Sequence, residues 1–171
     1  MCKDRCVLLS LSISVLALLA TFYQLYLQRV HNEKSLRPLG QIDLRDRNKL
    51  IAVCVTNNGL GPMLIKKITF FKEGKSYPTI EECLSLGARA YRRISISESA
   101  KKVILPNASL EVFAAELEAH EAEATLENIR TQLSPLTLEV DYRDIYDNKF
   151  TLQRNLNWFV RHIIDEKEGI T

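Results

Sequence analysis

The residues able to do acid–base, nucleophilic or metal chemistry are scattered along this chain. Its three histidines, His31, His120 and His162, are far apart, and none has a second ligand at the spacing of an H-x-x-x-H or H-E-x-x-H motif. No G-x-S-x-G motif occurs, and no cysteine lies near a histidine in sequence. We therefore interpret the three as surface histidines, and the sequence predicts no catalytic residue and no enzyme.

Three aspartates, Asp141, Asp144 and Asp147, recur at every third position. A calcium loop would need more oxygen ligands and a central glycine, which this segment lacks. Aspartate also favours turns, because its side chain bonds to nearby backbone amides. We predict a turn here and no metal site.

The four cysteines do not form a metal or redox motif. Cys2 and Cys6 lie at the N-terminal edge of a long apolar stretch, whereas Cys54 and Cys83 lie farther along the chain, and no C-x-x-C occurs. Cys54 stands in an apolar run, where a free cysteine packs as a small hydrophobe. A Cys54–Cys83 disulfide would require an oxidising compartment. The sequence thus predicts no cofactor.

Several polar motifs could bind a ligand or carry a modification, but each also has a purely structural explanation. Asn58–Gly61 could bind an anion, but it opens no helix, so a plain hairpin turn is predicted. The pairs Arg92-Arg93 and Lys101-Lys102 could contact anionic lipid headgroups of a cytoplasmic leaflet, but we interpret them as solvated loop charges. Asn107-Ala108-Ser109 is a glycosylation acceptor only in a secretory pathway. The net charge of +2 excludes a general nucleic-acid partner.

The longest uncharged stretch of the sequence is residues 6–28, which follows a short tail, residues 1–5. A helix of this length crosses the roughly 30 Å hydrocarbon core of a bilayer. The alternative is a cleaved signal peptide with Lys3 and Arg5 as its basic region, but no clean A-x-A cleavage site closes the run. We predict an uncleaved transmembrane helix.

Charge and small residues around this run predict its orientation and packing. The basic residues that follow it outnumber Lys3 and Arg5, which favours a cytoplasmic domain on a single-pass protein of the cell inner membrane. Ser10, Ser14 and Ala17 share one helix face and would permit self-association of the span. The bilayer is therefore the first predicted partner.

Beyond a stalk at 29–39, residues 40–171 have the length of one domain. The patterns predict strands at Gly40–Leu44, Lys49–Thr56 and Met63–Phe71, the second of them central because it is apolar on both faces. The intervening Asn57–Pro62 is a turn whose glycines supply positive φ.

Two helices are predicted inside the domain. Thr79 and Glu82 have the spacing of a capping box, with Gly87 as the end of a short helix. A second helix is indicated by an apolar stripe that stops before Pro135. The stripe consists of Ala122, Leu126, Ile129 and Leu133.

The remaining strands follow from alternation. Short strands are predicted around Ile94 and Ile96, around Val103 and Leu105, and over Leu110–Ala114. A hairpin joins Leu136–Tyr142 to a strand with Phe150, Leu152, Leu156 and Trp158 on one face. The fold class predicted is a mainly-β domain, a β-sandwich of which an immunoglobulin-like arrangement is one form, with one or two helical insertions. An α+β domain is the alternative.

Three segments carry a resemblance to a family. They are the stalk RVHNEKSLRP, the strand–turn–strand AVCVTNNGLGPMLIKKITFFKEGK and the hairpin LTLEVDYRDIYDNKF. The chain resembles uncharacterised bacterial single-pass membrane proteins with a small β-rich, Ig-like sandwich domain after an N-terminal span. Met63 stands where that family commonly has alanine. The resemblance covers most of the chain and implies this architecture, but its motifs are structural and carry over no catalytic residue.

These observations favour a membrane-anchored, non-enzymatic interaction or scaffold module that binds a protein partner. One alternative is a membrane-associated enzyme whose site is assembled from residues distant in sequence, which predicts a pocket with titratable groups of shifted pKa. Another is a small membrane effector that acts by oligomerisation of its span.

Overall fold

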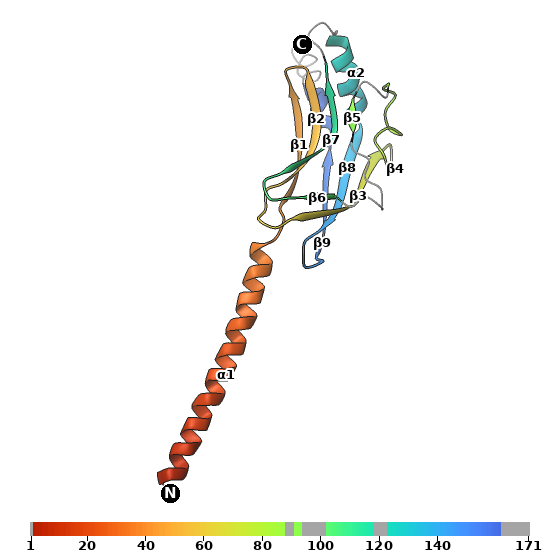
Figure 1. Cartoon of the computed structure of the whole chain (residues 1–171). Helices are drawn as coiled ribbons and strands as arrows, with labels where there is room; N and C mark the ends of the chain where they lie inside the picture. Colours follow the sequence, from red (N-terminus) through yellow and green to blue (C-terminus); the bar gives the residue numbers. More distant parts are fainter. Residues whose placement is uncertain (1, 88–90, 94–101, 118–122, 162–171) are drawn as a thin grey trace, which may run out of the picture. The chain divides into compact units, whose positions relative to one another are not determined.

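The computed structural model describes residues 2–87, 91–93, 102–117 and 123–161, and it divides the chain into two compact units, Met1–Leu36 and Arg37–Thr171 (Figure 1). The first is a single helix, and the second is a β-rich domain with its own hydrophobic core.

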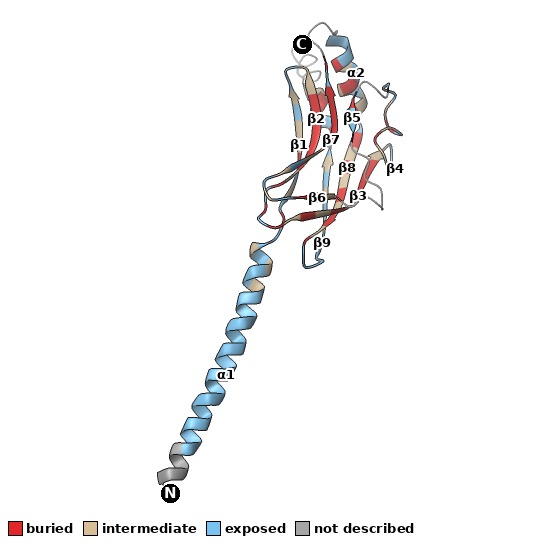
Figure 2. Ribbon diagram, viewed as in Figure 1, coloured by how far each residue is buried: buried red, intermediate tan, exposed pale blue. Residues whose placement is uncertain are grey.

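Helix α1 extends over Cys2–Ser35 and contains a segment, Val7–Ser35, long and apolar enough to cross a membrane. Its apolar side chains from Val7 onward are exposed (Figure 2). The hydroxyls of Ser12, Ser14 and Thr21 each donate a hydrogen bond of 2.9 Å to the carbonyl four residues earlier. This pairing removes their unsatisfied polar groups, which lets the helix tolerate a hydrocarbon environment.

The domain is a sandwich of two antiparallel sheets, as the sequence predicts, and not a closed barrel. The first sheet has the order β1-β2-β7-β5, with bounds Gly40–Arg47, Leu50–Asn57, Ser109–Glu116 and Arg92–Arg93. The second has the order β4-β3-β8-β9, with bounds Lys75–Tyr77, Met63–Lys72, Leu136–Arg143 and Lys149–Asn155. Strand β6, Lys102–Ile104, also pairs with β3.

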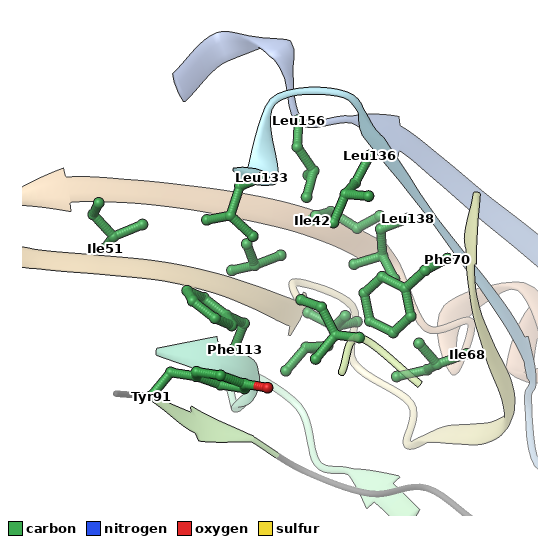
Figure 3. Packing of buried hydrophobic residues seen from close by; sticks show 14 of the residues in the cluster. Ile42, Ile51, Ile68, Phe70, Tyr91, Phe113, Leu133, Leu136, Leu138 and Leu156 are labelled. Atoms are coloured by element: carbon green, nitrogen blue, oxygen red, sulfur yellow. The ribbon is translucent and has the colours of Figure 1, made fainter. Parts of the chain in front are cut away.

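The core lies between the two sheets (Figure 3). Strand β8 alternates buried and half-buried side chains along its whole length, which confirms the predicted hairpin with β9. Strand β2 is buried on both faces and lies between β1 and β7, as predicted. Its Val53 faces the main core, whereas Ala52 and Cys54 form a small separate cluster with Ala114.

Helix α2, Glu123–Leu133, confirms the second predicted helix. Leu126, Ile129 and Leu133 are buried on one stripe, and Ala122 lies outside the described residues. A short 3-10 helix, η1, covers Asn157–Val160, and α2 contacts it. Trp158 therefore lies in η1 and Leu156 directly before it, so the predicted place of both residues on the last strand is wrong because β9 ends at Asn155.

The predicted helix between Thr79 and Gly87 is wrong. The segment forms turns, with hydrogen bonds from Cys83 N to Ile80 O (3.0 Å) and from Leu84 N to Glu81 O (3.3 Å). Thr79 Oγ1 donates to the Glu82 carboxylate at 2.9 Å, but this contact between two side chains pairs no backbone amide and is not a helix cap. Because initiating a helix is costly and few residues follow, the segment stays in turns.

The predicted hairpin turn at Asn57–Pro62 is also wrong. Strands β2 and β3, which it joins, belong to different sheets, so the segment crosses the sandwich. Gly59 does not have positive φ. Its role is close approach, because a Cβ there would lie 2.4 Å from both Arg37 O and Leu39 N.

The predicted inward face of the strand around residue 103 is shifted by one residue. Ile104 is the buried side chain, whereas Val103 and Leu105 are 53% and 63% exposed. The hydrophobic run offers both registers, and pairing of Ile104 with Met63 at the core selects this one. Ile94 and Ile96 lie outside the described residues.

Cys54 and Cys83 are both buried and free, so the disulfide considered above is not formed. Cys83 belongs to the main core, whereas Cys54 belongs to the small cluster with Ala52 and Ala114. Desolvation raises the pKa of both thiols above the ordinary value of 9.0. Both therefore stay protonated and behave as small hydrophobes.

Candidate interaction site

The most chemically distinctive concave site lies where the β1–β2 hairpin meets η1. We call it the arginine cleft. It has a volume of about 400 Å³ and is lined by Leu44, Arg45, Asp46, Arg47, Leu50, Trp158 and Arg161. The hairpin turn is formed by Asn48 (φ 51°) and Lys49 (φ 62°), two consecutive left-handed residues that match the twist of a tight hairpin.

An ion pair with Arg130 fixes Asp46, one of the residues that line this cleft. Arg130, on α2, donates two hydrogen bonds to the Asp46 carboxylate, 3.0 Å from Nε to Oδ2 and 2.9 Å from Nη2 to Oδ1. The Asp46 side chain is only 7% exposed and that of Arg130 only 13%. Arg130 also donates to Glu127 and Glu123. The hydrogen bond to Asp46 is the main cause that raises the pKa of Arg130, so this guanidinium remains charged.

The wall of the cleft is an arginine stacked on a tryptophan. The Arg161 guanidinium carbon lies 3.5 Å from the centre of the Trp158 ring, and its Nη1 lies 3.7 Å from Asp46 Oδ2. Trp158 packs edge to face on Phe159, which is fully buried. Arg161 Nη1 also donates a hydrogen bond of 3.1 Å to Trp158 O. These contacts fix a planar cation at the cleft surface, where stacking leaves the other N–H groups of the guanidinium edge able to donate.

The cleft presents groups that can bind an anion. Arg45 and Arg47 also line the cleft and are exposed. Because side chains alternate along a strand, these two project from the face of β1 opposite to Asp46 and Arg161. Such groups recognise carboxylates through paired hydrogen bonds. Among the described residues that line the cleft there is no serine, cysteine, histidine or lysine, and the one carboxylate, Asp46, already pairs with Arg130. The arrangement therefore favours an acidic, non-covalently held ligand.

A second organised region lies at the other end of the strands, around the buried Asn57. Its Oδ1 accepts hydrogen bonds from Leu39 N (3.2 Å) and Gly59 N (3.0 Å). Its Nδ2 donates to Gly61 O (2.8 Å) and Ile104 O (3.1 Å). One side chain thus joins the entrance to β1, the β2–β3 crossing and β6 into a single set of loops.

The three aspartates of the predicted turn have separate partners. Asp144 is buried and accepts bonds from the backbone amides of Tyr146 (2.8 Å) and Asn148 (2.9 Å), which confirms that the segment is a turn. Asp141 accepts from Thr151, and Asp147 pairs with Arg143, which lowers the pKa of Asp147. Within the described residues, no group of three or more histidine, cysteine or acidic side chains could hold a metal ion.

The other residues singled out in sequence are dispersed. His31 lies on α1 near Ser35, whereas His120 and His162 lie outside the described residues. Arg92 pairs with Glu111 and Glu116, and Arg93 pairs with Glu81, so both serve ion pairs of the domain. Lys101 lies outside the described residues and Lys102 is in β6. Asn107 occupies a turn with φ 57°.

The sequence did not predict the arginine cleft, because the residues that form it are distant in the chain. Asp46 and Arg130 are 84 positions apart. The sequence holds only a weak signal for it. Asp46 stands between two arginines just after the predicted strand Gly40–Leu44, and Arg130 follows Ile129 of the predicted apolar stripe.

Comparisons with known proteins do not place this chain in a family. No family model matches the sequence, and no curated protein matches it. A solved structure with some likeness is the archaellum periplasmic stator protein FlaG from Sulfolobus acidocaldarius. The match has 8% identity and a TM-score of 0.25, and covers 68% of this chain and 100% of that one. A likeness at this level says nothing about what this chain binds.

Proposed function

We propose that this chain is a membrane-anchored, non-enzymatic interaction module. The observation that carries the proposal is that the chain combines an exposed apolar helix with a domain whose arginine cleft presents guanidinium groups. An exposed helix of this hydropathy is unfavourable in water, so α1 holds the chain in a bilayer. The β-sandwich then serves as the part that recognises a partner.

The partner segment is acidic. An acidic segment that passes over the edge strand β1 at the cleft would place carboxylates on the exposed Arg45 and Arg47 on one side of the strand and on Arg161 on the other. Trp158 and the lining leucines would contact the apolar part of the same segment. Because the arginine charges are partly solvated, such binding would weaken as salt increases.

Two finer features belong to the same proposal. The domain is immunoglobulin-like, which is supported by the sheet orders β1-β2-β7-β5 and β4-β3-β8-β9, with α2 as an insertion between β7 and β8. It faces the cytoplasm at the inner membrane, which is supported by the basic residues after the span. Protease protection in spheroplasts tests the orientation, because a cytoplasmic domain is digested only after the membrane is broken.

The test of function is partner capture from native membranes in mild detergent, using the full chain. The double variant R45S/R47S removes two exposed cleft charges, and K66S/K67S removes two charges on the outer face of the second sheet as a matched control. A partner that binds the cleft is retained by the wild type and the control and lost by the cleft variant. Equal retention by all three proteins, or a lone monomer in each case, would contradict the proposal.

A further inference from the structure

The described part of the domain exposes large hydrophobic side chains at one end only. They belong to the segment before β1, the β2–β3 crossing, β6 with its following residue, and the β8–β9 turn (Figure 1). We call this set the apolar loop end. Its members are Leu39 (56% exposed), Leu60 (68%), Val103 (53%), Leu105 (63%), Ile145 (50%) and Tyr146 (40%).

These loops are held in place rather than free. Asn57 bonds to Leu39 N, to Gly59 N beside Leu60, and to the Ile104 carbonyl between Val103 and Leu105. Asp144 fixes the β8–β9 turn through the Tyr146 amide. Buried hydrogen bonds therefore hold these loops in a conformation that exposes their apolar side chains. Ordered apolar side chains gathered at one exposed place are typical of a docking surface.

Basic side chains adjoin the apolar loop end on the outer face of the second sheet. A hollow of about 330 Å³ there is lined by residues that include Lys66, Lys67, Arg143 and Lys149. Acidic groups offset part of this charge, because Asp141 lines the same hollow and Asp147 pairs with Arg143. Apolar tips beside basic side chains are the combination that binds the headgroup region of anionic membranes.

The short link between α1 and β1 indicates that a lipid bilayer is what covers the apolar loop end. Only Leu36 to Leu39 separate the end of α1 at Ser35 from the start of β1, and four extended residues reach at most about 14 Å. The charged end of α1, Arg29–Ser35, rises about 10 Å beyond the uncharged run. A headgroup layer is roughly 5–8 Å thick. Leu39 itself belongs to the apolar loop end, so this end is the one tethered close to a bilayer that holds α1.

We propose that the apolar loop end inserts into the headgroup region of the same bilayer that holds α1, with the neighbouring lysines and arginines on anionic headgroups. The inference rests on the proposed function in that α1 must be a membrane anchor. It leaves the arginine cleft, at the opposite ends of the strands, free for the partner.

The test places a fluorescent label at single cysteines of the full chain. Cys2 and Cys6 are replaced by serine, the two buried cysteines stay in place, and an environment-sensitive label is attached at L60C or I145C. R47C, on the hairpin at the opposite end, is the control. Each protein is reconstituted into vesicles of phosphatidylcholine and phosphatidylglycerol, with and without lipid spin-labelled near the headgroup.

The proposal predicts quenching several-fold stronger at L60C and I145C than at R47C, with a blue-shifted emission at the first two positions. Equal, weak quenching at all three positions in protein that resists a carbonate wash would overturn the inference and leave α1 as an anchor. Blue-shifted emission without quenching would also overturn it, because a protein partner or a second copy would then cover the surface. Release of the protein by the carbonate wash would overturn both this inference and the proposed function.

Discussion

Replacing Asn57 with alanine should cost a large part of the stability of the domain. The side chain is fully buried and makes four hydrogen bonds, two through Oδ1 and two through Nδ2. Each such bond contributes about 1 kcal/mol net, and the loops can recruit water at part of the vacated site, so N57A should lower the free energy of unfolding by about 3 kcal/mol.

A matched control is the next residue. Asn58 is exposed, and its side chain donates one hydrogen bond, of 3.0 Å, to Gln41 Oε1. N58A should therefore lower the free energy of unfolding by less than about 0.5 kcal/mol. The two substitutions remove the same atoms from neighbouring positions. The difference between their free energies of unfolding therefore measures the contribution of burial and of the four hydrogen bonds of Asn57.

The assay is urea unfolding of the full chain in detergent, followed by the fluorescence of Trp158. This is the only tryptophan, so the signal reports the domain and not α1. With a urea slope of about 1.5 kcal/mol per molar, N57A should lower the midpoint by roughly 2 M. If N57A unfolds within about 0.5 kcal/mol of N58A, Asn57 does not hold the loops together as described.

Three further predictions concern the rest of the domain. G59A should destabilise by about 2 kcal/mol in the same assay because its Cβ would meet backbone atoms, whereas G87A, with nothing within 4 Å, should not destabilise. D46A should cost about 2 kcal/mol by leaving Arg130 half-paired, whereas D147A, in an exposed pair, should change little; equal losses would contradict the ion-pair account. The two buried thiols should react with a maleimide only after unfolding. Because burial raises their folded pKa, the unfolded chain loses its thiol protons first, so stability should fall as pH rises above 9.0 and be unaffected by thiol ionisation below it.

Local periodicity predicted the elements whose environment is simple. Strand β8 alternates because one face meets the core, and α2 shows its stripe because one side packs on the sandwich. The apolar character of β2 on both faces correctly placed it between neighbours.

Long-range pairing explains what the sequence could not show. Nothing local in Asn57–Pro62 says whether the next strand returns to the same sheet or crosses to the other. Likewise, β6 acquires its register from its pairing with β3. The arginine cleft was missed for the same reason, since Asp46 meets Arg130 only after the sandwich has formed.

The most direct test of the central claim is the intact mass of the protein recovered from carbonate-washed native membranes. If α1 is an uncleaved anchor, as proposed, the protein stays in the membrane fraction with residues 1–35 attached. A soluble protein that has lost this segment would show that α1 is a cleaved signal sequence. The chain would then not be a membrane-anchored interaction module.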